Sequence, residues 1–511
     1  MSEIGRRGFV QRLAAMIAAA EVGFDTMGVG GLPGHELPKA PHGLPKLPDD
    51  AVVGIQMSPH TMLYEGIRPC LDLIRRTAAV NVVMPYSHAF HTSTLGKPVR
   101  DLAADHGKPP KDFRGKVPAV WVHHHDAYFE DTALRVKPTD PSLEFADRDL
   151  FAEMLKPCRE RGMKIYPRIL EASGRHVENF DQVRTVDVYG KPGRYGCWSN
   201  PDYRNFWADV ARDMFDHYEL DGFQWGAERM GPLMNVILPW NADPPTCFCP
   251  YCVARGEAAG IDAERAREGY TRLYEYVRRL MDDEYRPAEG VFTVFLRHLI
   301  RYPEILSWEY QYRLSREDVQ RKMYDAIKPI APRADVGWHI DHQPSSWDLV
   351  YRAEMSYEEM GEHSDFLKLI LYHAVLGPRI YSWYLERFHK TVLAELTLEQ
   401  SLGLYYAFFG YDPNVEPSVR ELPTHGFSPD YVYRETSRSV ASANGAARIY
   451  SGIGFDVPGS PPDDPRTIGR AVHAAFNGGA GGIVISREYE EMEVPHLKAV
   501  GDAVREMEAA G

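Results

Sequence analysis

Short apolar runs and helical patterns alternate along nearly the whole chain, and this alternation constrains the fold more than any other feature. Strands that alternate with amphipathic helices form β-α-β units and therefore a parallel sheet. Eight such runs match the eight strands of a (β/α)8 TIM barrel, so the sequence predicts an α/β fold of this type with long loop insertions. The predicted strands are 51–57, 80–86, 163–170, 220–226, 334–340, 366–371, 446–452 and 482–486. The predicted helices are 64–78, 144–161, 201–218, 263–328, 396–409, 466–477 and 496–507.

The chain divides into a predicted leader and one large barrel domain. Residues 1–48 contain the sequence GRRGFVQ at 5–11, a short apolar run and a linker rich in Gly and Pro. A twin arginine before an apolar run is typical of export signals, so we expect a periplasmic or secreted protein. The alternative is an amphipathic N-terminal helix on a cytoplasmic protein. Residues 49–511 form the predicted catalytic barrel, with insertions at about 87–140 and 229–310.

Composition narrows the class of partner. The net charge of −14 argues against a nucleic-acid partner, because nucleic-acid binding needs a basic surface. No apolar run approaches the ~20 residues of a membrane span. Aromatic residues make up 12% of the chain, which suits either a sugar-binding cleft or a large, well-filled core. A carbohydrate partner is therefore compatible with the composition, and the sequence leaves homo-oligomerisation open.

Polar and ionisable residues collect where the predicted strands end. In a TIM barrel the carboxyl ends of all the strands meet at one face, which holds the active site. The alternative is that strand ends are polar because loops begin there, but the repetition over several strands favours a shared site. The residues at these ends are Glu171, Glu228, Asp341, His342, Tyr372, His373, Asp456, Arg487 and Glu488.

Two carboxyl groups at this face predict glycosidic-bond hydrolysis. Glycosidases use one carboxylic acid to protonate the leaving group and a second carboxylate as nucleophile or base. Glu228 follows the fourth strand beside apolar residues and is the predicted acid; the alternative is an ion pair with Arg229. The second carboxylate is predicted among Asp341, Asp456 and Glu488, and the choice between retention and inversion stays open.

Further residues are predicted to bind the sugar. Consecutive side chains of a strand point to opposite faces, so in the run 123–125 only His123 and His125 can converge. For these two, hydrogen bonding to sugar hydroxyls or a polar loop is favoured over a metal site. The predicted substrate-binding residues are Glu171, Gln224, Trp225, His123, His125, His339, His342, Tyr372, His373 and Arg487.

Three cysteines, Cys247, Cys249 and Cys252, lie within six positions. Together with Cys197 they supply four thiolates, which suit a closed tetrahedral zinc site with a structural role. The alternative is one disulfide with a free thiol, which an exported protein could form.

The segment 196–252 resembles the middle of the family 42 β-galactosidases and of related hypothetical glycoside hydrolases with α-L-fucosidase-like barrels. The similarity rests on GCWSNPDYR at 196–204, the strand that carries Glu228 and the C-x-C-x-x-C cluster. It implies that Glu228 is the acid/base and that Cys197, Cys247, Cys249 and Cys252 bind structural Zn²⁺. Two positions depart from the family: Ala227 replaces its Asn, and Asp456 stands where its strand-seven Glu is expected.

Three functions follow from these observations. The first is a glycoside hydrolase that cleaves O-glycosidic bonds by carboxylate acid/base catalysis. The second is a carbohydrate-binding barrel without hydrolysis, which the two departures from the family motivate. The third is a metal-dependent hydrolase or lyase that uses His124, His125, His339 or His373.

Overall fold

The fold is a closed (β/α)8 TIM barrel. The computed structural model describes residues 41, 43–90, 105–171, 174–238, 243–282 and 284–510, so the predicted twin-arginine motif lies outside the described residues. Within them, parallel strands pair in the order β1-β2-β5-β9-β10-β11-β12-β13, and β13 pairs with β1 to close the barrel. The strands are β1 (Val52–Met57), β2 (Val82–His88), β4 and β5 (Lys164–Ile165 and Arg168–Leu170, which share the third position), β9 (Gly222–Gly226), β10 (Asp335–Ile340), β11 (Phe366–Ile370), β12 (Arg448–Gly454) and β13 (Gly482–Ser486). Each of the eight predicted strands therefore exists.

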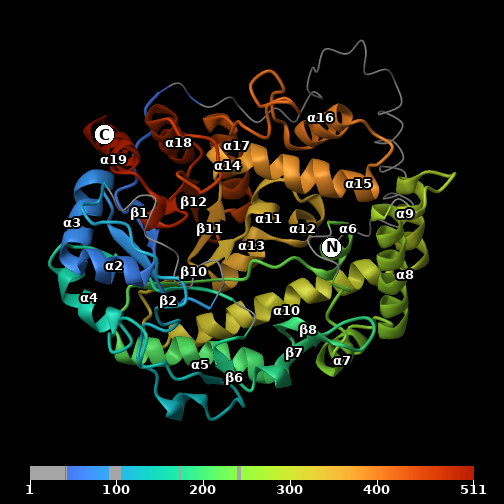
Figure 1. The fold of residues 1–511 in the computed structure, drawn as a ribbon, viewed down its shortest axis with the longest axis horizontal. Helices are drawn as coiled ribbons and strands as arrows, with labels where there is room; N and C mark the ends of the chain where they lie inside the picture. The colour runs from blue at the N-terminus through green and yellow to red at the C-terminus, as the bar shows by residue number, and fades with distance from the viewer. Residues whose placement is uncertain are drawn as a thin grey trace.

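A ring of helices covers the barrel, and the first of them, α3, packs against the last, α19. Figure 1 shows this closure, where the blue N-terminal elements meet the red C-terminal ones. The covering helices are α3 (Ile67–Ala78), α4 (Leu150–Arg159), α5 (Pro201–His217), α10 (Glu304–Ile327), α13 (Tyr357–Met360), α17 (Pro429–Ala443), α18 (Pro465–Asn477) and α19 (Val494–Ala510).

One predicted covering helix differs from the structure. The predicted helix 396–409 forms α16, but the helix that packs on β12 and α18 is α17. The sequence of α17 reads as polar because it buries charged residues: Glu435 is fully buried and accepts a hydrogen bond from Arg352 at 2.6 Å. An ionic contact thus replaces part of the apolar face that a covering helix usually shows.

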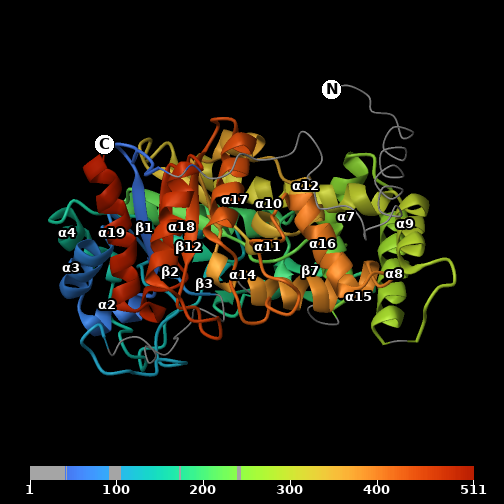
Figure 2. The same cartoon turned by 90° about the horizontal axis from the view of Figure 1, so that it is seen from above.

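The remaining elements decorate the barrel. Figures 1 and 2 both place α8 and α9 at the end of the molecule that is farthest from α3 and α4. The helices are α2 (Pro59–Glu65), α6 (Pro232–Ile237), α7 (Pro250–Ala258), α8 (Ala263–Met281), α9 (Val291–Arg301), α11 (His342–Ser346), α12 (Leu349–Glu354), α14 (His373–Ile380), the π-helix η4 (Tyr381–Phe388), α15 (His389–Val392) and α16 (Leu398–Phe409). Two pairs of short antiparallel strands are present, β3 (Arg135–Val136) with β6 (Val177–Glu178) and β7 (Arg184–Val186) with β8 (Pro192–Gly196). The 3₁₀ turns are η1 (Asp126–Phe129), η2 (Phe180–Val183), η3 (Gly361–His363) and η5 (Tyr489–Glu491).

Apolar side chains fill the lower part of the barrel interior. Val82, Met84, Tyr166, Phe366 and Tyr450 belong to one buried cluster contributed by several strands. Side chains two positions apart on a strand share a face, so the next inward positions along these strands lie above this apolar floor. Those positions carry the polar residues of the site. Among the described residues, no helix is both long and apolar enough to span a membrane.

Candidate active site

A cavity of about 740 Å³ opens above the apolar floor, at the carboxyl ends of the barrel strands. Many of the predicted residues line it, because inward strand positions and the loops just beyond them converge there. The predicted residues in its lining are Glu228, His339, Asp341, His342, Tyr372, Arg487 and Glu488.

Glu228 is more accessible than Asp341 and Glu488, the other two carboxyl groups predicted to be catalytic that line the cavity, with 33% of its side chain exposed. His339, two positions before Asp341 on β10, lies with Nε2 at 3.1 Å from Glu228 Oε1. Burial lowers the pKa of His339 to about 4. The ring is therefore neutral near pH 7 and donates its Nε2–H to the Glu228 carboxylate.

Asp341 has the opposite environment. Its side chain is buried, and burial together with the negative charge of Glu228 raises the pKa of Asp341 to about 7. The backbone N–H of His342 donates to Oδ1 at 2.5 Å. The amide of Gln343, oriented with its NH₂ toward the carboxyl group, donates to Oδ2 at 2.8 Å. Asp341 is thus held in one position while a large fraction of it keeps its proton near neutral pH.

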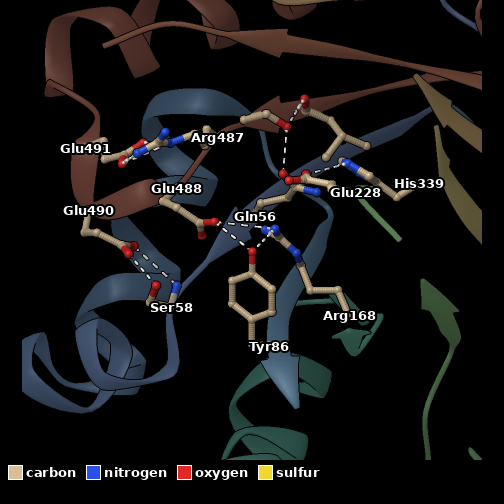
Figure 3. Close-up of polar contacts among 12 residues, drawn as sticks. Gln56, Ser58, Tyr86, Arg168, Glu228, His339, Arg487, Glu488, Glu490 and Glu491 are labelled. Atoms are coloured by element: carbon tan, nitrogen blue, oxygen red, sulfur yellow. Dashed lines mark hydrogen bonds and ion pairs between the residues drawn. The ribbon is translucent and has the colours of Figure 1, made fainter. Parts of the chain in front are cut away.

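Glu488 lies on the other side of the cavity in a paired network, shown in Figure 3. Tyr86 donates its hydroxyl to Glu488 Oε1 at 3.0 Å, and Arg168 lies 3.4 Å from the same oxygen. Arg168 also donates to the Tyr86 hydroxyl, and its guanidinium lies 3.9 Å from the centre of that ring. All three side chains are buried, so this carboxylate faces a permanent cation.

A buried lysine completes the centre of the barrel. Lys368, on β11, donates to the hydroxyl of Tyr372 at 3.0 Å and is fully buried. Burial and the neighbouring Arg168 hold the pKa of Lys368 well below its usual range. The lysine therefore fixes Tyr372 in the cavity wall as a hydrogen-bond donor, without a permanent charge.

Five predicted residues lie away from the cavity lining. Asp456 accepts a hydrogen bond from His496 Nδ1 at 2.8 Å, at the start of α19. Glu171 is buried behind the wall, where Trp198 and Arg229 donate to it at 2.8 and 3.0 Å. The remaining three are fully buried: Trp225 packs outward on Trp207 of α5, and Gln224 and His373 lie within the fold. We therefore leave all five out of the candidate site.

The histidine run also lies elsewhere, against α5. His124 Nδ1 and His125 Nδ1 lie 2.7 and 2.8 Å from the two oxygens of buried Asp213. His217 stacks on His125, with ring centres 3.7 Å apart, and its Nδ1 is 3.0 Å from Asp213 Oδ1. The backbone N–H of His123 donates to a tyrosine hydroxyl. These imidazoles pair with a carboxylate on the outside of the barrel, so they do not reach the cavity.

Four buried cysteines meet beside the cavity wall. The sulfur atoms of Cys197, Cys247, Cys249 and Cys252 lie within 4.8 Å of one another, and none is in a disulfide. Cys197 Sγ is 3.4 Å from both Cys249 Sγ and Cys252 Sγ. A tetrahedral site with Zn–S bonds of ~2.3 Å needs sulfur atoms about 3.8 Å apart, whereas a disulfide needs ~2.05 Å. The arrangement therefore fits a four-coordinate metal ion.

Comparison with solved structures finds matches at low sequence identity. The β-galactosidase from the psychrophilic Marinomonas ef1 matches with 10% identity and a TM-score of 0.49, over 90% of this chain and 60% of that one. The α-L-fucosidase isoenzyme 2 from Paenibacillus thiaminolyticus has 12% identity and a TM-score of 0.43, over 90% and 49%. The PgaB (BpsB) glycoside hydrolase domain from Bordetella bronchiseptica has 13% identity and a TM-score of 0.44, over 89% and 98%.

The chain spans about three fifths of the first of these proteins and about half of the second. By their names the three matched structures are glycoside hydrolases. No protein-family model and no curated protein matches the chain.

Several lining residues were not predicted from the sequence. Tyr86 and Arg168 are polar residues at inward positions of otherwise apolar strands. A polar residue at such a position could have indicated that it lines the cavity. Gln56 gave the same signal near the end of β1. Arg379 and Trp383 belong to α14 and η4 after the sixth barrel strand, where no motif marks them.

Proposed function

We propose that this protein is a glycoside hydrolase whose two catalytic carboxyl groups are Asp341 and Glu228. The observation that carries the proposal is their opposite environments in one cavity. Asp341 is buried with a pKa raised to about 7, while Glu228 is accessible and accepts a hydrogen bond from neutral His339. Glycosidic-bond cleavage requires two carboxyl groups, one that keeps its proton and one that acts as nucleophile or base.

The environments assign the roles. Asp341 carries its proton near pH 7 and is the general acid that protonates the departing oxygen. Glu228, the more accessible of the two, attacks the anomeric carbon or activates a water molecule. The sequence suggests Glu228 as the acid, but we assign that role to Asp341. The reason is burial: the Asp341 side chain is buried, whereas 33% of the Glu228 side chain is exposed. Glu488 is already paired with Arg168, so we assign it to substrate positioning.

The proposal is tested with a panel of aryl glycosides that differ in leaving group. In Asp341→Asn the loss of turnover should be large for poor leaving groups and small for good ones, because only the former need protonation. In Glu228→Gln the loss should be similar for both. Wild-type protein that binds sugars and turns over no glycoside of the panel would favour the carbohydrate-binding barrel.

We also propose that Cys197, Cys247, Cys249 and Cys252 hold a structural Zn²⁺. The thiols are buried and converge with metal-like spacing. Zinc bound there would tie β8 to the start of α7, next to the cavity-lining segments around Arg194 and Thr246. Purified protein should contain about one zinc per chain, and Cys249→Ser should lower both zinc content and melting temperature. Metal-free protein with a disulfide in this cluster would contradict the proposal.

We propose, finally, that residues 1–48 act as a twin-arginine export leader. The support is the Arg6-Arg7 pair before an apolar run. Fusing the leader to a reporter should direct it out of a bacterial cytoplasm, and Arg6→Lys with Arg7→Lys should abolish export. A reporter that stays inside the cell with the intact leader would overturn the assignment.

A further inference from the structure

The arginines that line the cavity differ in whether a carboxylate lies within ion-pair distance of them. Four of its arginines form an ion pair with a carboxylate. The pairs are Arg168 with Glu488 (3.4 Å), Arg194 with Asp243 (3.5 Å), Arg229 with Glu171 (3.0 Å) and Arg487 with Glu491 (2.5 Å). Among the described residues, Arg379 has no carboxylate within ion-pair distance. Its hydrogen bond goes to an imidazole, with Nη1 at 2.5 Å from His342 Nδ1.

The His342 ring holds Arg379 in place without neutralising it. Burial and the charge of Arg379 keep the pKa of His342 well below its usual range, so the ring is neutral and its Nδ1 accepts the hydrogen bond. Burial and the positive charge of Arg487 lower the pKa of Arg379, while Tyr372 and the more distant carboxyl groups of Glu228 and Asp341 partly oppose this. A guanidinium nevertheless stays protonated in proteins. Two cations therefore face the same part of the cavity, and among the described residues no carboxylate is in direct contact with one of them, Arg379.

Aromatic rings frame this cation. Trp383 lies four residues after Arg379, so both side chains project from the same side of the helical segment. The guanidinium carbon lies 5.2 Å from the Trp383 ring centre and 5.8 Å from that of Tyr372. Trp383 belongs to the π-helix η4; π-helical turns are rare and frequent at functional sites. Together Arg379, Trp383 and Tyr372 form one corner of the cavity wall, which we call the cationic corner.

We propose that the cationic corner binds an acidic group of the substrate, so that the glycoside is a uronate or a sulfated sugar. A desolvated cation with no carboxylate in direct contact costs free energy, and an incoming carboxylate or sulfate recovers it. The planar guanidinium suits either anion, because both offer two oxygens to its fork of donors. The Trp383 and Tyr372 rings supply apolar faces on which the sugar ring packs. This inference rests on the proposed glycosidase function and adds the substrate class to it.

The test compares acidic and neutral aryl glycosides of the same ring configuration, with a uronide arm and a sulfated arm. Wild-type protein should prefer one acidic arm over the neutral sugar, and the preferred arm identifies the anion. Arg379→Gln should reduce kcat/KM for that arm by roughly 10–100-fold, the usual worth of a charged hydrogen bond, mainly through KM. Turnover of the neutral glycoside should fall by a smaller factor, because that sugar offers no anion to Arg379. Arg379→Lys should restore part of the preference.

A matched control and a binding assay keep the proposal falsifiable. Arg194→Gln removes another lining arginine that already has a carboxylate partner, and the preference for the acidic sugar should survive. Binding of free glucuronate and glucose 6-sulfate against glucose, measured by calorimetry, needs no turnover. If acidic sugars bind but no glycoside is cleaved, the proposed hydrolase function is wrong and the proposed anion-binding subsite stands. Equal binding of acidic and neutral sugars, or equal losses on both in Arg379→Gln, would overturn the subsite.

Discussion

The two sides of the cavity handle negative charge in different ways. On one side, Glu488 is 2% exposed and is held by Tyr86 and Arg168, so its charge is matched inside the protein. On the other side, Glu228 is 33% exposed and Asp341 is buried with no cation within ion-pair distance among the described residues. Carboxyl groups that are already paired fix geometry, whereas carboxyl groups that titrate near neutral pH can move protons. The comparison therefore separates a positioning half from a reacting half.

The largest expected effect is on the reacting half. Glu228→Gln should lower turnover by at least ~10²–10⁴-fold, the range for a positioned catalytic group. The His339 ring can still donate to the new amide oxygen, so the melting temperature should stay close to that of the wild type. Steady-state kinetics and thermal unfolding on the same preparation measure both. A variant that unfolds earlier but keeps its turnover would assign Glu228 to the positioning half.

Glu488→Gln should show the reverse balance. The substitution leaves Arg168 as a buried cation without a counter-ion, and breaking a buried ion pair costs about 3–5 kcal/mol of unfolding free energy. Urea denaturation measures this loss. The double variant Arg168→Met with Glu488→Met is the matched control, because it removes both charges and should recover much of the stability. A single variant as stable as the wild type would show that the pair contributes nothing.

A smaller effect should appear in the pH profile. Asp341 must be protonated to act as an acid, and its pKa is about 7, so kcat/KM should fall about tenfold per pH unit above pH 7. Below pH 7, kcat/KM should stay constant until Glu228 takes up a proton. In Asp341→Asn the basic limb should disappear with good leaving groups. A wild-type profile that stays flat to pH 9 would exclude Asp341 as the acid.

The smallest expected effect is a pH-dependent gain of stability. An unfolded Asp ionises near pH 3.9, while folded Asp341 keeps its proton up to about pH 7. As the pH rises through this window the unfolded chain releases the proton first, so the native state loses stability. Asp341→Asn removes this penalty, and its melting temperature should exceed that of the wild type at pH 8 more than at pH 4. Asp456→Asn, which breaks the contact with His496, should instead lower it.

The sequence alone determined the barrel and the face that carries the site. The eight apolar runs became strands because β-branched and aliphatic residues suit strands that are covered on both faces. Glu228, Asp341 and Glu488 lie in the cavity because parallel strands all end at one face. The same rule misplaced Asp456 and His373, since a residue just past a strand can turn toward a covering helix as easily as toward the axis. Trp225 was misplaced because strand parity points it outward, onto α5.

Only the tertiary structure decided which groups meet and how they ionise. Tyr86 and Glu488 are 402 positions apart, and no local pattern links them. The roles of Glu228 and Asp341 follow from their different burial, and Arg379 stands out only because the other lining arginines have partners from distant segments. Desolvation and Coulomb interactions depend on what surrounds a group in space, and a barrel brings those surroundings from all eight strands. For that reason the order of residues along the chain predicts the face of the barrel but not the chemistry of each carboxyl group on it.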